Sequence, residues 1–444
     1  MTLGRIKIAF FALLGLLIGS WLISVGAGEV PATFWQARRL LVPFTGILAI
    51  SMMAAGVLLA ARPVQIERFL GGLDKFYRLH KWLGIGAVIV AIAHWLLEVA
   101  PRWAIGWGWL ERPARSGPPR GAGGGESLMQ SLRHPAAEVG EWGFYLLLAL
   151  TALALWKRFP YHLFFKTHRL MAPLFLALLF HAVVMMPTAF WSAPIGIVSG
   201  VLMAGGGVAA LASLFHRIGH SRRAVGRICS LHAYRANSVL DVGVALQTSW
   251  PGHEAGQFAF LDFDHAEGAH PFTVSSSWRG DGKLMFSIKG LGDYTRRLPQ
   301  LLKLGQAVTV EGPYGRFDFH GDAPRQLWVA GGVGITPFVA RLQKLVEAPT
   351  GKPVDLIYST AARDDEFVGH VRELAERAGV AFHLLDTQKE GFLTLERLQA
   401  WAPGWREADV WFCGPLGFGK SLYGSMAAAG LPDGRFHQEL FEMR

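Results

Sequence analysis

The sequence predicts a multidomain membrane protein: a six-helix transmembrane bundle, then an antiparallel β-barrel, then an α/β nucleotide-binding domain with a parallel sheet. Of the 444 residues, 51% are hydrophobic, and nearly all the long apolar runs lie before about residue 215, as expected of membrane-spanning helices. From about residue 224 short segments of alternating polarity follow one another, as in an antiparallel sheet. From about residue 326 strands and helices alternate, as in a parallel sheet covered by helices. We therefore expect domains at residues 1–222, 223–322 and 323–444.

The first domain contains six apolar segments close to the length that a bilayer core requires, about 20 residues. They fall at about 6–26, 41–61, 80–100, 142–157, 168–187 and 194–215. The first segment could instead be a cleaved signal peptide, because SVGAGE resembles a cleavage site built of small residues.

Basic residues indicate how the six segments are oriented. Five lie between the second and third segments, four between the fourth and fifth, and three after the sixth. These regions share one side of the membrane, which the positive-inside rule makes cytoplasmic. The loop from about 101 to 141 carries five arginines on the other side, but it is long and rich in Pro and Gly. We expect a multi-pass protein of the inner or plasma membrane with its soluble domains in the cytoplasm.

The net charge of +10 is explained by basic residues near the ends of the membrane segments. No basic stripe or recognition motif indicates that the protein binds nucleic acid.

Four histidines in the third and fifth segments form two pairs. His80 and His94 are fourteen residues apart, and His168 and His181 are thirteen apart. Each pair spans roughly 20 Å along a helix. The two segments run parallel, so the histidines meet at two levels, and two imidazoles at each level could hold a haem. No C-x-x-C-H motif occurs, so the haems would be two haem b groups, bound without thioether links.

Other interpretations of these residues stay open. Each histidine could be hydrogen-bonded within the bundle, and His162 is a rival ligand at the cytoplasmic level. Gly84 and Gly86 could let a porphyrin approach the backbone or could serve helix packing.

The soluble half contains a glycine-rich turn between a predicted strand and a predicted helix, GGVGITP from Gly331 to Pro337. Glycines let the backbone reach a pyrophosphate, and a helix N-terminus offers free N–H donors. Cys229 has no motif around it, so we expect a buried small side chain. The two cysteines are far apart in sequence and suggest no disulfide framework.

Several motifs together resemble those of the NADPH oxidase and ferric reductase families. The resemblance covers nearly the whole chain, as a ferric reductase-type transmembrane domain fused to a ferredoxin–NADP reductase-type module. The flavin motif corresponds to His270, Pro271, Phe272, Thr273 and Ser275, its pyrophosphate segment to Gly292 and Thr295, and the end of the flavin barrel to Gly312–Gly315. The nicotinamide-nucleotide segments correspond to Gly331, Gly332, Gly334, Thr336 and Pro337, and to Cys413, Gly414 and Pro415.

The resemblance implies a reductase that uses FAD, two haems and NADPH or NADH. Cytosolic NAD(P)H would reduce the flavin, and single electrons would cross the membrane by way of the haems to an acceptor outside. Cys413 would lie beside the nicotinamide, and Phe441 would cover the flavin ring and move aside for catalysis. His270 replaces the arginine that the wider superfamily has there, which leaves its contact with the flavin or its phosphates less defined. The sequence contains no EF-hand pattern, so nothing in it suggests gating by calcium.

The segment after the second strand of the parallel sheet bears on the choice of nucleotide. Ser359, Thr360 and Arg363 occupy the place where a 2′-phosphate would sit, and no acidic residue ends the strand, although Asp364 and Asp365 follow soon after. This favours NADPH and leaves NADH open.

The sequence leaves the acceptor and two other functions open. The acceptor could be ferric iron, another metal chelate, oxygen giving superoxide, or a redox partner protein. The chain could also be an electron-transfer subunit that feeds a protein partner, or a flavin reductase with a purely structural membrane anchor.

Overall fold

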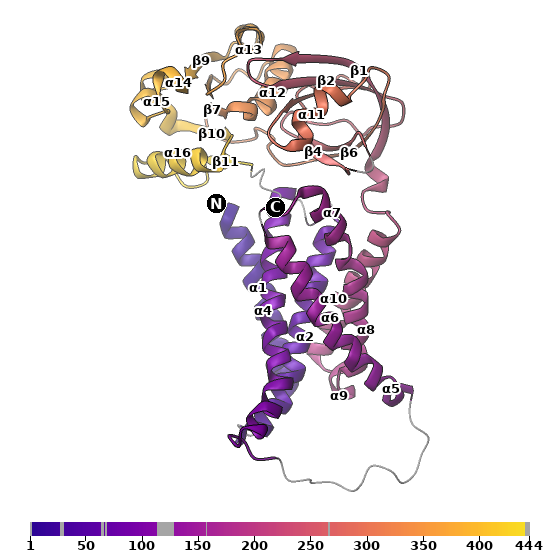
Figure 1. The fold of residues 1–444 in the computed structure, drawn as a ribbon. Coiled ribbons are helices and arrows are strands. Elements are labelled where there is room, and N and C mark those ends of the chain that lie inside the picture. Colours follow the sequence, from indigo (N-terminus) through magenta and orange to yellow (C-terminus); the bar gives the residue numbers. More distant parts are fainter. Residues whose placement is uncertain are drawn as a thin grey trace. The chain divides into compact units, whose positions relative to one another are not determined.

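The computed structural model describes the chain except residues 1, 27–30, 64–65, 67–68, 113–127, 157, 265–266 and 440–444. Phe441 therefore lies outside the described residues, and so does the side chain of His162. The chain divides into two compact units, which are coloured along the sequence in Figure 1. One unit is Thr2–Leu70 with Lys75–Ile218, and the other is Gly71–Asp74 with Gly219–Arg444.

The first unit is helical, and six of its helical segments are long and apolar enough to cross a membrane. The predicted number of spans is therefore confirmed in the described part of the chain, although several helices run past the predicted bounds. With 34 residues, α4 measures about 50 Å and exceeds the roughly 30 Å of a bilayer core. The helices are α1 Thr2–Val25, α2 Phe34–Ala60, α4 Leu73–Gly106, α5 Leu128–Ser131, α6 Arg133–Leu155, α7 Tyr161–Arg169, α8 Met171–Met185, α9 Thr188–Trp191 and α10 Pro194–Leu214.

The fifth span differs from its prediction because it consists of two helices. The candidate span Leu163–Met185 includes the end of α7 and all of α8, with Leu170 between them. Pro173 has no N–H to donate to the carbonyl of Arg169, and its ring crowds that carbonyl, which favours a break at this point. His168 and His181, expected on one helix, are therefore on two.

The second unit begins with a six-stranded sheet that is antiparallel throughout, in the order β4-β3-β6-β1-β2-β5. The strand order describes an open sheet, whereas the sequence predicted a closed barrel. An isolated bridge between Val274 and Phe286 links the end of β4 to the opposite edge strand β5. The strands are β1 Arg223–Tyr234, β2 Val239–Leu246, β3 Phe258–Asp262, β4 His270–Thr273, β5 Lys283–Lys289 and β6 Ala307–Tyr314, with η1 His220–Arg222 before β1 and α11 Asp293–Leu301 between β5 and β6.

Alternating residues of this sheet fill one core. Val242, Phe286 and Val310 are fully buried, on β2, β5 and β6, and Leu298 of α11 packs with them. The period-two alternation in the sequence thus corresponds to one buried face.

A five-stranded parallel sheet follows, in the order β11-β10-β7-β8-β9. Trp328 and Leu356 face a core shared with α12 and α13, whereas Val329 and Ile357, the next residue of each strand, face a core shared with α15 and α16. Helices therefore cover both faces, as predicted (Figure 1). The elements are β7 Arg325–Gly331, η2 Gly332–Ile335, α12 Thr336–Glu347, β8 Val354–Thr360, α13 Asp365–Arg377, β9 Ala381–Asp386, α14 Thr387–Glu390, α15 Leu395–Trp401, η3 Trp405–Glu407, β10 Ala408–Cys413, α16 Leu416–Ala428 and β11 Phe436–Gln438.

Candidate functional site

The histidines of the helical unit come together in the predicted pairs. The ring centroids of His80 on α4 and His168 on α7 are 6.0 Å apart, with an angle of 78° between the ring planes. His94 and His181 are close enough to interact electrostatically. Residues that are almost ninety positions apart in the sequence therefore meet at two levels of the bundle.

His80 and His94 each hydrogen-bond to a carbonyl of the neighbouring helix α2. Nδ1 of His80 lies 2.9 Å from the oxygen of Gly56, and Nδ1 of His94 lies 3.0 Å from that of Val42. A ring nitrogen that bonds to a carbonyl carries the hydrogen, so Nε2 keeps its lone pair. Val42 and Gly56 are fourteen residues apart, as are His80 and His94, so the antiparallel helices keep one register over both contacts.

His181 on α8 makes the same kind of contact with α6, where Nδ1 donates to the carbonyl of Ala136 at 2.7 Å. His168 is the exception: its Nδ1 is buried and has no hydrogen-bond partner in the described part of the chain. In the register that His181 sets, the partner of His168 would be thirteen residues beyond Ala136, at Ala149. Because α7 is a separate helix, His168 does not continue that register.

Three glycines that the sequence analysis missed make room for these imidazoles. A Cβ on Gly140 would overlap the ring of His181, one on Gly46 would lie 3.1 Å from His94, and one on Gly56 would lie 3.6 Å from His80. A glycine that lies opposite a histidine across two antiparallel apolar helices is the signal that could have found them.

The two glycines that were predicted have other surroundings. A Cβ on Gly86 would overlap Met52 of α2, which identifies a packing contact. Nothing lies within 4 Å of the same position on Gly84. Phe175 is fully buried, and its ring would lie 3.0 Å from a Cβ on Gly206 of α10.

The histidine geometry fits a haem held between two imidazoles. A bond of about 2 Å from each imidazole to a metal places the two ring centroids roughly 6 Å apart, which agrees with His80 and His168. Metal-bound histidines usually donate their other N–H to a carbonyl or carboxylate, and His80, His94 and His181 do so. Among the described residues, no cluster of three or more His, Cys, Asp or Glu side chains could hold a bare metal ion instead.

In the second unit, the predicted flavin motif forms β4. His270 is half-buried and stacks on Tyr294 of α11, with ring centroids 4.7 Å apart. Burial lowers the pKa of His270, and Glu267 and Asp262 partly oppose this. Thr273 and the following Ser275 are buried, whereas Pro271 and Phe272 are partly exposed.

The predicted pyrophosphate segment of the flavin motif lies at the start of α11. Thr295 is engaged locally, because its Oγ1 accepts hydrogen bonds from the N–H groups of Leu291 and Gly292, both at 3.0 Å. Gly292 is the residue before the helix. The hydroxyl of Thr295 thus fixes the backbone of this turn.

The glycine-rich turn after β7 packs tightly against the end of β10. A Cβ on Gly334 would overlap the carbonyl of Cys413, and one on Gly331 would lie 2.8 Å from Pro415. A Cβ on Gly414 would lie 3.0 Å from Gly331. Three of the predicted glycines therefore serve the close approach of two strand ends. Thr336 and Pro337 form the first turn of α12.

Gly332 has a different environment from those glycines. Its φ of +57° favours glycine. Its Cβ position meets no backbone and lies 3.6 Å from Nζ of Lys289.

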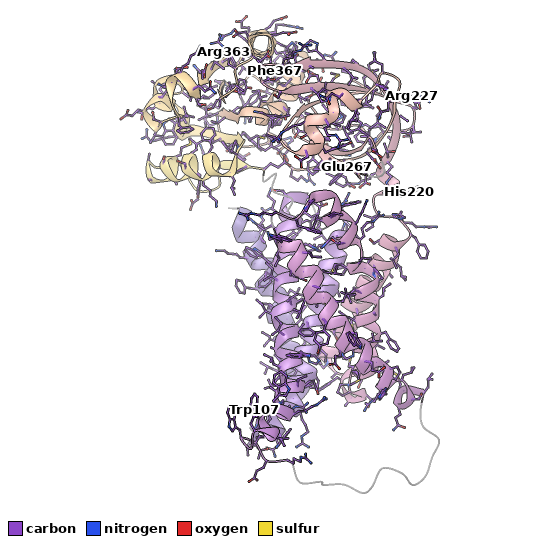
Figure 2. All side chains as sticks on the ribbon, in the orientation of Figure 1. Trp107, His220, Arg227, Glu267, Arg363 and Phe367 are labelled. Carbon is purple, nitrogen blue, oxygen red and sulfur yellow. The ribbon has the colours of Figure 1, made fainter. Side chains whose placement is uncertain are left out.

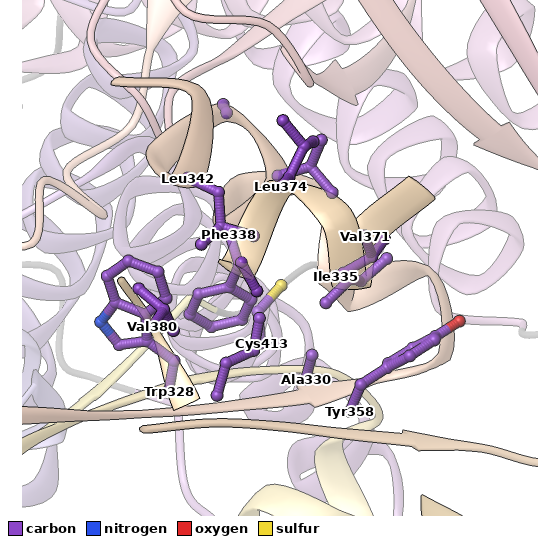
Figure 3. Close-up of a cluster of buried hydrophobic side chains, with 14 of the residues drawn as sticks. Trp328, Ala330, Ile335, Phe338, Leu342, Tyr358, Val371, Leu374, Val380 and Cys413 are labelled. Carbon is purple, nitrogen blue, oxygen red and sulfur yellow. The ribbon is translucent and has the colours of Figure 1, made fainter. Parts of the chain in front are cut away.

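The thiol of Cys413 lies in the hydrophobic core between the parallel sheet and α12. It is 1% exposed, and Figure 3 shows it among Phe338, Ile335 and Ala330. Burial raises the pKa of the thiol, and the carboxylate of Glu439 adds to the rise. The predicted place of Cys413 beside a nicotinamide stays a prediction. Cys229, expected to be buried, is exposed.

Glu439 is a buried carboxylate that the sequence analysis missed. It is 4% exposed, and a Cβ on Gly315 would lie 3.0 Å from its Oε1. Glu439 thus lies near both Cys413 and the turn that ends β6. An acidic residue two positions before the predicted flavin cover Phe441 was the available signal.

The residues predicted to contact a 2′-phosphate lie at the end of β8. Ser359 is buried and pairs with Gly331 in the sheet. Arg363, labelled with Phe367 in Figure 2, is exposed and pairs with Asp365 at 2.6 Å. Asp364 caps α13 through the N–H of Phe367, so neither acid occupies the end of the strand.

Comparisons with known proteins give matches to both the membrane half and the soluble half of the chain. Residues 45–179 match the family described as ferric reductase like transmembrane component, and residues 227–318 match an FAD-binding domain. The glycine betaine monooxygenase reductase subunit of Pseudomonas aeruginosa is 28% identical over 206 residues, which are 42% of this chain and 55% of that protein. An NADPH oxidoreductase of Mycobacterium tuberculosis is 28% identical over 197 residues, 43% of this chain and 52% of that protein. The chain thus spans about half the length of these relatives.

Among solved structures, a flavohemoglobin from Malassezia yamatoensis aligns with 91% of this chain and 97% of its own, at 17% identity and a TM-score of 0.49.

A membrane-spanning helical domain followed by an FAD- and NAD(P)H-binding reductase module defines the class, a membrane-bound electron-transfer oxidoreductase. Within that class, the two domain matches confirm the resemblance to the fused ferric reductase/NADPH oxidase-like family that was found in the sequence.

Proposed function

We propose that the protein is a transmembrane reductase that transfers electrons from NAD(P)H, by way of FAD and two haem b groups, to an acceptor on the opposite side of the membrane. Its domains are a di-haem domain at residues 1–222, an FAD domain at 223–322 and an NAD(P)H domain at 323–444. When bound, the flavin supplies the conversion between hydride transfer and single-electron transfer, and the haems supply single-electron carriers.

The observation that carries this proposal is the paired arrangement of four histidines. His80 and His168 have the separation expected across one metal. In His94 and His181, Nδ1 is hydrogen-bonded to a carbonyl, so the lone pair of Nε2 is available to bind a metal. Two imidazoles on each iron would leave no open site on the metal, so an acceptor would react at the edge of the haem.

The protein's own residues position the flavin and the nucleotide. His270, with its lowered pKa, presents an uncharged imidazole at neutral pH, and Pro271, Phe272, Thr273 and Ser275 form the neighbouring surface. Gly292 and Thr295 shape the turn that approaches the flavin phosphates. Cys413, Gly414 and Pro415 border the nicotinamide.

The end of β8 favours NADPH over NADH. An acidic residue at that strand end would bind the 2′-hydroxyl of NADH, but Asp364 is engaged as a helix cap and Asp365 pairs with Arg363. Arg363 is exposed and can exchange the carboxylate of Asp365 for a 2′-phosphate.

We place the protein in the inner or plasma membrane with its FAD and NAD(P)H domains in the cytoplasm. The basic residues between the second and third, and between the fourth and fifth, spans support this orientation. The acceptor is then a metal chelate or oxygen on the outer side.

The test is an anaerobic reduction followed by visible spectroscopy. Purified protein mixed with NADPH should show the bands of reduced haem after the flavin bleaches. A ferric chelate or oxygen is then admitted to see which one reoxidises the protein, with superoxide dismutase as the control. A preparation that contains flavin and no haem would overturn the proposal.

A second candidate is a reductase component that feeds a protein partner. The names of two relatives favour it, a monooxygenase reductase subunit and a dioxygenase electron transfer component. It predicts slow turnover with small acceptors and a partner that co-purifies.

A further inference from the structure

A pocket lies between the antiparallel sheet and the glycine-rich turn, both within the second unit. It is a small recess, and its walls include Asn237, Ser287, Lys289, Gly332 and Thr336. A recess of this size suits one group of a larger ligand. Its described lining includes one cation and no carboxylate, which favours an anion.

The side chain of Asn237 provides a buried donor without a partner. Asn237 is 4% exposed, and its Oδ1 accepts the N–H of Val239 at 3.0 Å. Only an oxygen can accept that N–H, so the orientation of the amide is fixed and Nδ2 faces away from Val239. No hydrogen-bond partner for Nδ2 exists in the described part of the chain. Buried polar groups rarely stay unpaired, so this amide indicates a ligand with an acceptor atom.

Lys289 contributes a positive charge to the same pocket. It ends β5 and pairs with Val239 in the sheet, so Asn237 and Lys289 come from neighbouring strand ends. Its ammonium makes no ion pair with any described residue, and it points toward Gly332, at 3.6 Å from the Cβ position. A lysine ammonium close to a glycine-rich turn that leads into a helix is an arrangement that binds phosphate.

We propose that Asn237 and Lys289 bind the pyrophosphate of NAD(P)H together with the turn Gly332–Thr336. The remaining walls include Tyr358 and Thr360 at the carboxyl end of β8, the edge where open α/β sheets bind ligands. For this reason the nicotinamide nucleotide fits the pocket better than FAD. The inference rests on the proposed function and adds that the flavin-domain sheet supplies side chains to the hydride donor.

Asn237 is the only asparagine in the sequence, so its amide can be observed selectively. The FAD-loaded full chain, labelled with ¹⁵N-asparagine and held in detergent, has one side-chain NH₂ signal. Titration with NADP⁺ should shift that signal in a saturable way. An NH₂ signal that does not move while NADP⁺ demonstrably binds would overturn the proposal.

Kinetics of flavin reduction test the two residues separately. Lys289→Gln should raise the KM for NADPH about tenfold, the effect of one charge-assisted hydrogen bond, with little change in kcat and an unchanged flavin content. Asn237→Asp keeps the oxygen that accepts from Val239 and replaces the donor with a negative charge, so KM should rise at least as much. Lys283→Gln, at the exposed other end of β5, is the matched control and should leave KM unchanged.

The outcomes separate the inference from the proposed function. If the unaltered protein is reduced by neither NADPH nor NADH, the proposed function fails. If it is reduced normally and Lys289→Gln keeps its KM, only this inference fails. If Lys289→Gln instead loses flavin and regains a normal KM when FAD is in excess, the pocket binds the flavin phosphates and the inference is again wrong.

Discussion

At the scale of single residues, the helical unit depends on small side chains placed opposite large ones. The imidazole of His181 reaches the carbonyl of Ala136 only because Gly140, one turn further along α6, has no side chain. The same holds, less tightly, for Gly46 and His94. Residue identity at these positions is set by a neighbour that is distant in sequence.

Replacing Gly140 with alanine should therefore displace His181. We expect the loss of the bond to Ala136, a cost in the free energy of unfolding of about 1–3 kcal/mol from overpacking, and a lower haem content. Haem per flavin and the thermal midpoint measure the two effects. Gly19→Ala is the control, because nothing lies within 4 Å of that position on α1. Equal haem content in both variants would argue against ligation by His181.

The two cysteines should differ in their reaction with maleimide. Cys229 is exposed and should be labelled at pH 8 in the folded protein. Burial raises the pKa of Cys413, so its thiol should stay protonated and be labelled only after unfolding. The unfolded chain releases this proton near the ordinary thiol pKa of about 8.5, so the free energy of unfolding should fall as the pH rises above that value. Peptide mapping by mass spectrometry, with Cys229→Ser as the control, decides this; rapid labelling of Cys413 in the folded state would contradict it.

At the scale of elements, the break at Leu170 explains why the pattern of His181 is not repeated at His168. In α4 an unbroken helix carries both of its histidines in register with α2. In the fifth span Pro173 interrupts the helical register between the two histidines, and His168 lies on a separate short helix.

Pro173→Ala should join α7 and α8 into one helix, because an N–H becomes available to the carbonyl of Arg169. His168 would then move away from His80, and the protein should lose the haem of that pair and keep the other. The haem-to-flavin ratio and the reduced spectrum give the readout. Pro101→Ala is the control, because α4 already runs through this proline. This variant should keep both haems.

A helix cap is one of the contacts that join the two sheets of the second unit. Asp364 accepts the N–H of Phe367 at 3.1 Å in α13 and the N–H of Ala236 at 3.2 Å in the β1–β2 turn. Asp364→Ala should cost about 1–2 kcal/mol and lower the temperature at which flavin fluorescence is released. Asp365→Ala loses only an exposed ion pair with Arg363 and should stay within about 0.5 kcal/mol. Similar midpoints for the two variants would refute this view of the cap.

At the scale of the whole molecule, the proposed function requires electrons to cross the bilayer. In proteoliposomes with NADPH outside and an impermeant ferric chelate inside, the chain should reduce the chelate. The double variant His94→Ala, His181→Ala should still bleach its flavin with NADPH and should lose delivery to the inside. Delivery at the unaltered rate in that variant would show that electrons take another path.

Much of the architecture could be predicted from the sequence because it depends on local patterns. Hydropathy over about 20 residues located six spans, and alternation with turn residues located the two sheets. Residue spacing along single helices was enough to predict which histidines meet, since helix geometry fixes rise per residue.

Other features depend on distant neighbours and could not be predicted in that way. The environment of Cys413, the carboxylate of Glu439 and the glycines opposite the histidines are set by packing between elements, and so are the exposed thiol of Cys229 and the open strand order of the antiparallel sheet. Asn237 shows what the sequence alone could not predict, because an asparagine in a sequence indicates only a turn.

The sequence by itself determined the class of protein, its six spans and the pairing of its histidines, because periodicity and chain length act locally. Only the tertiary structure decided which atoms those histidines bond to, which glycines serve packing, and that a buried amide and a lysine from one sheet meet the glycine-rich turn of the other. The physical reason is that hydrogen-bond satisfaction and close packing depend on atoms brought together from distant positions in the chain.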